Sequence, residues 1–97
     1  MRKLSIVVPL KDERDNLEPL YRQIRDALRG HVDWEAIFVD DGSGDGSFEV
    51  LTQLAQADPR VKVVRLRRNF GQAAAMQAGI DAATGDVVAT MDGDLQN

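Results

Sequence analysis

Short apolar runs alternate with segments of helical periodicity along the whole of this chain. The runs are rich in β-branched residues and are closed by proline, glycine or aspartate, which is typical of buried strands. Between them, apolar residues recur every three or four positions, as they do on a helix that packs one face against a core. The expected strands are 4–8, 34–39, 61–66 and 87–91, and the expected helices are marked by apolar positions within 17–28, 48–55 and 72–83.

This alternation predicts an α/β fold of the Rossmann-like kind, with a parallel sheet and helices on both faces. Parallel strands need crossover connections, and those connections are right-handed. If the first two crossovers step one way and the third returns across the sheet, the strand order is 3-2-1-4. The first two helices then lie on one face and the third on the other, with Trp34 and Phe48 expected as core anchors.

The predicted order reverses between the first and fourth strands. In open α/β sheets, ligands bind outside the carboxyl ends of the strands at such a reversal. Pro9, Asp40 and Asp92 each stand at the carboxyl end of an expected strand. We therefore expect them to converge on one crevice.

The segment VVATMDGDLQN, residues 87–97, delivers Asp92 and Asp94 at the end of an apolar run that is expected to be buried on both faces. Oxygen ligands without histidine or cysteine favour Mg2+ or Mn2+, and such ions usually accompany a phosphate-bearing substrate. An acidic turn that merely ends a strand would be the better explanation of an isolated D-x-D. The second acidic strand end, at Asp40 and Asp41, favours a metal and nucleotide site.

Two loops at the same edge carry further candidates. In the loop DDGSGDGS, glycines let the backbone approach a ligand, and Asp40 can accept a hydrogen bond from a base N–H or a ribose hydroxyl. Asp45 and Ser47 are better explained as caps of the following helix. Between the third strand and the third helix, Arg67, Arg68, Asn69 and Gly71 could hold phosphate, although solvated charges at a strand exit are an equally good explanation.

Composition sets the broad class of the protein. Ninety-seven residues, 43% of them apolar, suffice for a single domain over 1–97. There is no cysteine, which excludes disulfides and thiolate metal sites and suits a reducing, cytoplasmic setting. A net charge of −4 argues against nucleic acid as a partner. No apolar run approaches the roughly 20 residues of a membrane span.

Four ordered motifs resemble the N-terminal part of family 2 glycosyltransferases of the GT-A fold, and most closely the polyprenyl-phosphate sugar transferases. The motifs are SIVVPLKDERDNL, FVDDGSGDGS, RLRRNFGQAAAMQAG and TGDVVATMDGDLQN. The resemblance implies transfer of a sugar from a UDP- or GDP-linked donor to a polyprenyl phosphate, with Mg2+ or Mn2+ as cofactor. It implies a nucleotide site that comprises Pro9, Leu10, Glu13, Asp40, Asp41 and Asn69, and a metal and diphosphate site that comprises Asp92, Asp94 and Gln96.

The chain departs from the family pattern at Lys11 and Asp12, where an aromatic residue and asparagine are frequent, so an aromatic surface for the base is missing. The family also continues past Asn97 into a half that is expected to supply the catalytic base, the acceptor site and association with the cytoplasmic face of a membrane. The 97 residues by themselves are then expected to be inactive. Two alternatives remain: a folded non-catalytic fragment that self-associates through strand 87–91, and, less favoured, a phosphatase of the haloacid dehalogenase type.

Overall fold

The computed structural model describes residues 2–30 and 33–91. It contains one parallel sheet in the order β3-β2-β1-β4, which confirms the predicted topology. The elements in chain order are β1 (Lys3–Leu10), α1 (Arg14–Leu28), β2 (Asp33–Asp40), α2 (Ser47–Ala57), β3 (Val61–Arg65), α3 (Gln72–Ala82) and β4 (Val87–Thr90).

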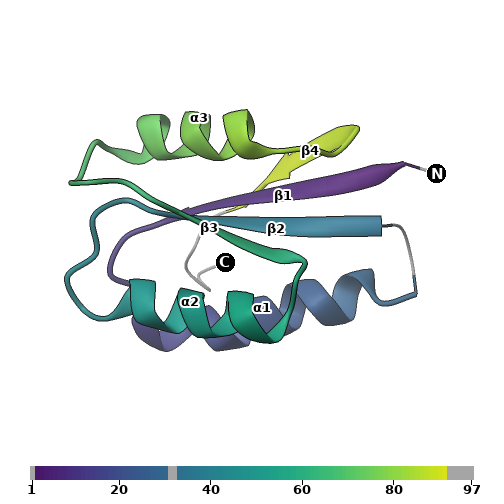
Figure 1. The fold of residues 1–97 in the computed structure, drawn as a ribbon, viewed down its shortest axis with the longest axis horizontal. Helices are drawn as coiled ribbons and strands as arrows, with labels where there is room; N and C mark the ends of the chain where they lie inside the picture. Colours follow the sequence, from purple (N-terminus) through teal and green to yellow (C-terminus); the bar gives the residue numbers. More distant parts are fainter. Residues whose placement is uncertain (1, 31–32, 92–97) are drawn as a thin grey trace.

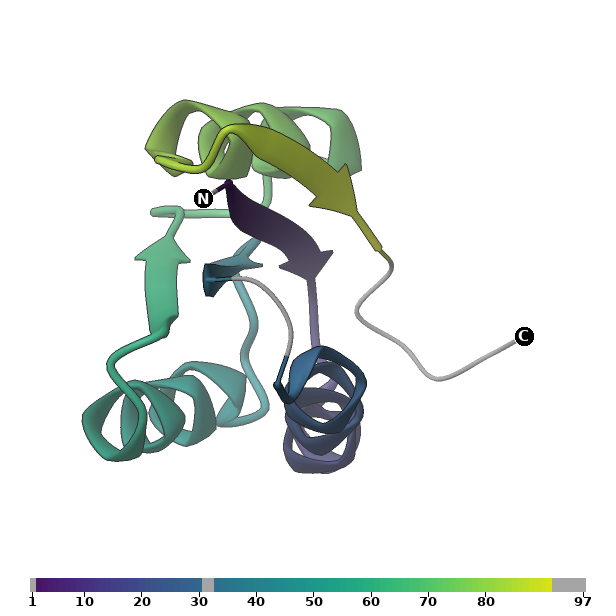
Figure 2. The ribbon, with the colours of Figure 1, turned by 90° about the vertical axis from the view of Figure 1, so that its right-hand side faces the viewer.

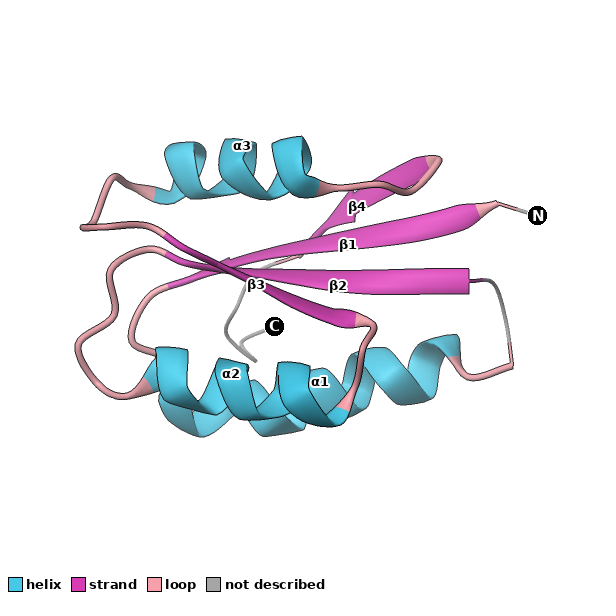
Figure 3. Ribbon diagram, viewed as in Figure 1, coloured by secondary structure: helices cyan, strands magenta, loops and turns pink. Residues whose placement is uncertain are grey.

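The helices cover both faces of the sheet, as expected. α1 and α2 lie side by side on one face, and α3 lies on the other (Figures 1 and 2). The secondary-structure colouring makes the three layers plain (Figure 3). The larger core lies under α1 and α2, where Leu17, Leu20 and Phe38 are fully buried. The smaller core lies under α3 and is built on Val7, Ile37 and Val39 of the central strands.

α3 packs closely on the sheet because its inward positions are small. Ala75 and Gly79 are its buried residues. A Cβ built on Gly79 would collide with Val7 and lie 3.0 Å from Cγ2 of Val39. Because Gly79 has no side chain, α3 can pack this close to the sheet.

A buried carboxylate fastens the amino edge of the sheet. Glu35 of β2 is only 1% exposed. Its Oε2 accepts hydrogen bonds from Ser5 Oγ at 2.5 Å and from Thr84 N at 2.8 Å, and its Oε1 lies 2.6 Å from Lys62 Nζ. Burial alone would raise the pKa of Glu35, but the hydrogen bonds from Lys62, Ser5 and Thr84 outweigh it and lower the pKa to about 2. Glu35 thus ties the connection between α3 and β4 to the sheet.

Two expectations about packing differ from the structure. The strand at 87–91 was expected to be buried on both faces, but Val87 and Val88 are 43% and 41% exposed because β4 is an edge of the described sheet. Phe48 was expected to be a core anchor beside Trp34. Trp34 is buried, whereas Phe48 is half-buried and its ring lies 4.2 Å from the guanidinium carbon of Arg65.

The substitution Glu35→Gln should destabilise the fold in a pH-dependent way. The pKa of Glu35 is lowered from 4.5 to about 2 in the folded state, so its contribution is present above pH 4.5 and is lost as pH falls through about 2. At pH 7 the free energy of unfolding should fall by about 1–3 kcal/mol, the usual worth of hydrogen bonds to a charged group. The difference from the parent should close near pH 2, which denaturant titration at several pH values measures.

The matched control is Glu49→Gln, the same chemical change at an exposed position of α2. It should change the free energy of unfolding by less than about 0.5 kcal/mol. Equal stability of Glu35→Gln and the parent at pH 7 would show that the buried carboxylate does not hold the edge together.

Candidate functional site

Three loops meet at the carboxyl edge of the sheet, on the left in Figure 1. They connect β1 to α1, β2 to α2 and β3 to α3. Two backbone bonds join the strand ends beneath them: Asp41 N donates to Leu10 O, and Leu66 N donates to Asp40 O, both at 2.9 Å. The carboxyl ends of β1, β2 and β3 are therefore held together, beside the β1–β4 reversal at which ligands bind in open α/β sheets.

Asp40 is the most unusual side chain at this edge. It is fully buried at the end of β2, and its Oδ1 accepts a hydrogen bond from Ser43 N at 2.8 Å. Its Oδ2 is equally buried and receives no hydrogen bond from the described residues. Because an unpaired buried acceptor is costly, this atom requires a partner beyond those residues, such as a ligand or a water molecule.

The neighbouring carboxylate, Asp41, differs from Asp40 because both of its oxygens are hydrogen-bonded. It is 5% exposed, and both of its oxygens are occupied: Oδ1 accepts from Phe70 N at 2.8 Å and Oδ2 from Gly71 N at 3.0 Å. Sequence reasoning grouped the two aspartates as ligands of one nucleotide. The structure brings both to the edge but leaves a free oxygen only on Asp40.

The first two loops are bound to each other through Asp12. Asp12 N donates to Ser43 Oγ, and Gly44 N donates to Asp12 Oδ1, both at 2.8 Å. Asp12 has φ 54, a left-handed conformation that aspartate tolerates better than most residues. Sequence reasoning noted Asp12 only as a departure from a family pattern. Its left-handed backbone and its reciprocal hydrogen bonds could be found only in three dimensions.

Asp45 was expected to cap the second helix. Asp45 Oδ1 accepts from Ser47 N at 3.0 Å, and Asp45 Oδ2 accepts from Arg14 N at 3.2 Å, although the N-cap position itself is Gly46. Asp45 therefore serves the starts of both α1 and α2.

The remaining residues predicted for the first loop lie at or under the edge. Pro9 stands two residues after Val7, the last residue of β1 that pairs with β4; Val7 pairs with Thr90, and its carbonyl accepts from Met91 N. Strand alternation points the Pro9 nitrogen to the same side, where it has no hydrogen to donate, so the β1–β4 ladder ends there. Leu10 packs into the core. Glu13 is the N-cap residue of α1, and its Oε1 accepts from Asn16 Nδ2 at 2.8 Å.

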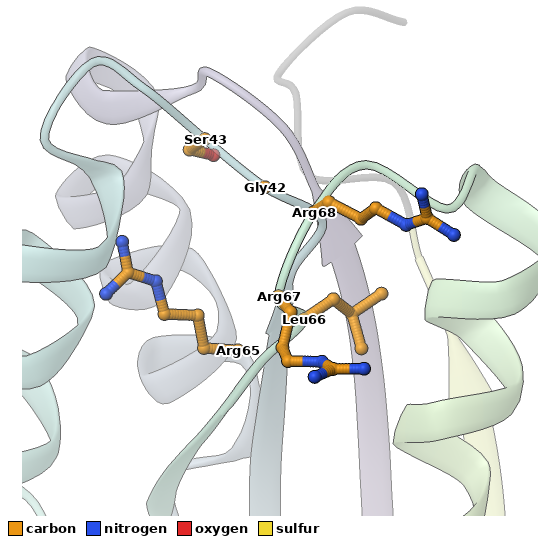
Figure 4. Close-up of a pocket in the computed structure, with 6 residues that line it drawn as sticks. All are labelled: Gly42, Ser43, Arg65, Leu66, Arg67 and Arg68. Atoms are coloured by element: carbon orange, nitrogen blue, oxygen red, sulfur yellow. The ribbon is translucent and has the colours of Figure 1, made fainter.

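Asn69 is exposed on the loop between β3 and α3. Beside it is a cleft of about 410 Å³ lined by Gly42, Ser43, Arg65, Leu66, Arg67 and Arg68 (Figure 4). Figure 4 shows the Arg65 side chain directed toward α2 and the Arg68 side chain directed toward α3. The cleft is therefore lined by the backbone that follows Asp40 and Asp41 and by residues 65–68, three of which are arginines.

Asp92, Asp94 and Gln96 lie outside the described residues. β4 ends at Thr90, and Met91 still donates its N–H to the sheet. Within 2–30 and 33–91, no group of three or more histidine, cysteine, aspartate or glutamate side chains is placed to hold a metal ion. None of the helices in this part of the chain is long and apolar enough to cross a membrane.

Curated relatives match almost the whole chain. A dodecaprenyl-phosphate galacturonate synthase of Rhizobium johnstonii is 45% identical over 98% of the chain and 29% of its own length. An undecaprenyl-phosphate 4-deoxy-4-formamido-L-arabinose transferase of Salmonella choleraesuis is 38% identical over 100% of the chain and 30% of its own length. The chain therefore spans less than a third of the length of these relatives.

Solved structures match its fold. The mannosyltransferase PcManGT of Pyrobaculum calidifontis, solved with GDP-Man and Mn2+, has a TM-score of 0.83 and 24% identity, and covers 94% of this chain and 27% of its own. TarS 1-349 of S. aureus, solved with UDP-GlcNAc, has a TM-score of 0.81 and 23% identity, and covers 95% of this chain and 26% of its own. The likeness shows a shared GT-A architecture.

The family model described as glycosyl transferase family 2 matches residues 5–97, a range that includes all three edge loops and the D-x-D segment. The family match, the strand order and the loops at the carboxyl edge all indicate the same fold. This chain belongs to glycosyl transferase family 2.

Proposed function

We propose that residues 1–97 are the donor-binding part of a metal-dependent glycosyltransferase that transfers a sugar from a nucleoside diphosphate to a polyprenyl phosphate. The observation that carries the proposal is the buried, unpaired Oδ2 of Asp40 at the end of β2, which is next to β1 in the sheet and one strand away from the reversal of strand order between β1 and β4. An acceptor atom there suits a nucleoside, which offers N–H and hydroxyl donors. The relatives from Rhizobium and Salmonella, a dodecaprenyl-phosphate galacturonate synthase and an undecaprenyl-phosphate sugar transferase, support a polyprenyl phosphate as the acceptor.

In this proposal Asp40 receives a hydrogen bond from the base or the ribose, with Ser43 N holding its other oxygen in place. In the same proposal Asp41 and the first-loop residues Pro9 and Glu13 belong to the nucleotide site together with Asn69, and Leu10 supports the site from the core. The proposed donor is a UDP- or GDP-linked sugar.

Asp92, Asp94 and Gln96 offer only oxygen ligands, a set that fits Mg2+ or Mn2+. These residues would hold the ion, and a metal ion there would supply positive charge to neutralise the charge that develops on the leaving diphosphate. The aspartates are ligands in this scheme and not nucleophiles. The acceptor phosphate is already an anion, so it needs less help from a general base than a sugar hydroxyl does, and that base is expected beyond Asn97.

The setting proposed for the intact protein is the cytoplasmic face of a membrane, where a polyprenyl phosphate presents its head group. The phosphatase alternative loses its support, because the glycosyltransferase family model covers the D-x-D segment itself. The other alternative is that the chain is a folded fragment without catalytic activity. Radiolabelled sugar transfer to a polyprenyl phosphate by the intact protein, set against residues 1–97 alone, separates the two.

The substitution Asp40→Asn should weaken nucleoside diphosphate binding by about tenfold or more, because an amide NH2 would face a donor of the ligand. The loss should be the same with and without Mn2+, as calorimetric titration with UDP and GDP would show. The unfolding midpoint without ligand should not fall, because the substitution removes a buried unpaired charge.

Asp33→Asn is the control, since it makes the same change at the exposed opposite end of β2. It should leave the affinity for nucleotide unchanged. A variant of Asp40 that changed only the affinity for Mn2+ would place Asp40 in the metal shell and contradict the assignment.

The substitution Asp92→Ala should abolish the dependence of nucleotide binding on metal. The parent should bind a nucleoside diphosphate at least about tenfold more tightly with Mn2+ than with a chelator, because a cation held by these oxygens would attract the diphosphate. The variant should bind equally in both conditions, and far-ultraviolet circular dichroism should match the parent. Metal-independent binding by the parent would contradict the proposed metal site.

Residues 1–97 alone should self-associate through β4. Val87 and Val88 are exposed on this edge strand, and an uncharged apolar edge is a template for pairing with another chain. Val88→Lys should weaken the association, because the charge would have to be desolvated on pairing. Light scattering at micromolar concentration measures the mass, and a stable monomer of the unmodified residues would refute the prediction.

A further inference from the structure

The carboxylate of Asp41 joins two loops that are far apart in sequence. Its oxygens accept the N–H groups of Phe70 and Gly71, which lie 29 and 30 residues further along the chain. An ionised carboxylate only accepts hydrogen bonds, and two consecutive backbone donors suit its two oxygens. Because the group is 5% exposed, these bonds are shielded from competition by water.

Two glycines make this arrangement possible. Gly71 has φ 100 and ψ 160, a region that is open almost only to glycine. Gly42, with φ 82, passes so close to the other loop that a Cβ on it would lie 2.6 Å from Asn69 N. The backbone of both loops is thus built for contact at the point where Asp41 joins them.

The two joined loops line the cleft that lies beside the end of β2. Gly42 and Ser43 of the loop after β2 and Arg67 and Arg68 of the loop after β3 are among its lining residues (Figure 4). Ser43 N in turn holds Oδ1 of Asp40. Anything that releases the loop from Asp41 therefore changes the distance between the arginine side of the cleft and Asp40.

We infer that Asp41 is a positioning residue: it does not contact the nucleotide but holds the β3–α3 loop at the distance from Asp40 that the nucleoside requires. The inference rests on the proposed function of this edge as a nucleotide site. The same hydrogen bonds give the backbone N–H groups of Phe70 and Gly71, just before α3, an acceptor within the protein. The N–H of Gly71 is occupied by Asp41, so it does not serve the diphosphate, and nucleoside and diphosphate are bound by separable parts of the protein.

That separation provides the test. In the intact protein, Asp41→Asn should weaken the binding of UDP and GDP by about tenfold or more, because an amide can accept only one of the two bonds. Binding of inorganic pyrophosphate with Mn2+ should stay within about twofold of the parent, because it reports on the metal and diphosphate part alone. Hydrogen exchange in the peptide covering 66–72 should become faster.

Gly71→Ala is the second variant, since it displaces the same loop without touching the carboxylate. It should give the same pattern: weaker nucleoside diphosphate binding, unchanged pyrophosphate binding and faster exchange over 66–72. Gly44→Ala is the matched control, because Gly44 has no positive φ and a Cβ there meets nothing within 4 Å. This control should behave as the parent in all three measurements.

The inference is overturned if Asp41→Asn weakens UDP and GDP binding while exchange over 66–72 and the affinity of Gly71→Ala stay unchanged, because Asp41 would then be a direct ligand. It is overturned too if Asp41→Asn binds nucleotide as the parent does, or if pyrophosphate and nucleotide are weakened in proportion, as a general folding defect would produce. A parent protein that binds neither UDP nor GDP rejects the proposed function itself, which is a different result from any of these.

Discussion

The position of β1 between β2 and β4 is the constraint on which the rest of the structure depends. The chain adds β2 and β3 on one side of β1 and then returns, over α3, to place β4 on the other. All four strands are parallel, so their carboxyl ends share one edge. Pro9 ends the β1–β4 ladder at that edge, and the two strands can diverge there to admit a ligand.

Two adjacent aspartates at this edge have the same side chain but different hydrogen-bond partners, because they occupy different positions in the fold. Asp40 ends β2 and has a buried oxygen that receives no hydrogen bond from the described residues, whereas both oxygens of Asp41 accept hydrogen bonds from the backbone of another loop. A carboxylate left unpaired at a buried site is an energetic cost, and proteins tolerate such costs mainly at functional sites. Asp41, with both oxygens hydrogen-bonded, is suited to holding two loops together.

Much of this architecture could be predicted from the sequence, because strand and helix periodicities are local properties. The four strands, the three helices, the order 3-2-1-4 and the convergence of Pro9 with Asp40 followed from apolar runs and from the rule for parallel crossovers. The difference between Asp40 and Asp41 did not, because the backbone groups that occupy both oxygens of Asp41 lie 29 and 30 positions further along the chain. Asp12 and Glu35 were missed for the same reason: a single charged residue in a loop or strand has no periodicity that marks its partners.

The amino edge matters to the site because it sets the register of β4. Glu35 holds Thr84, Ser5 Oγ accepts from Gly85 N at 2.8 Å, and β4 then begins with Val87 opposite Leu4. A Cβ on Gly85 would lie 2.8 Å from Lys3 O, so the connection can pass only without a side chain there. Once that register is fixed, Met91 meets Val7, and Asp92 is the next residue in the sequence. A slip of one residue would turn every β4 side chain to the other face, so the contacts of Glu35 at the amino edge help to fix which residues of β4 face each side of the sheet.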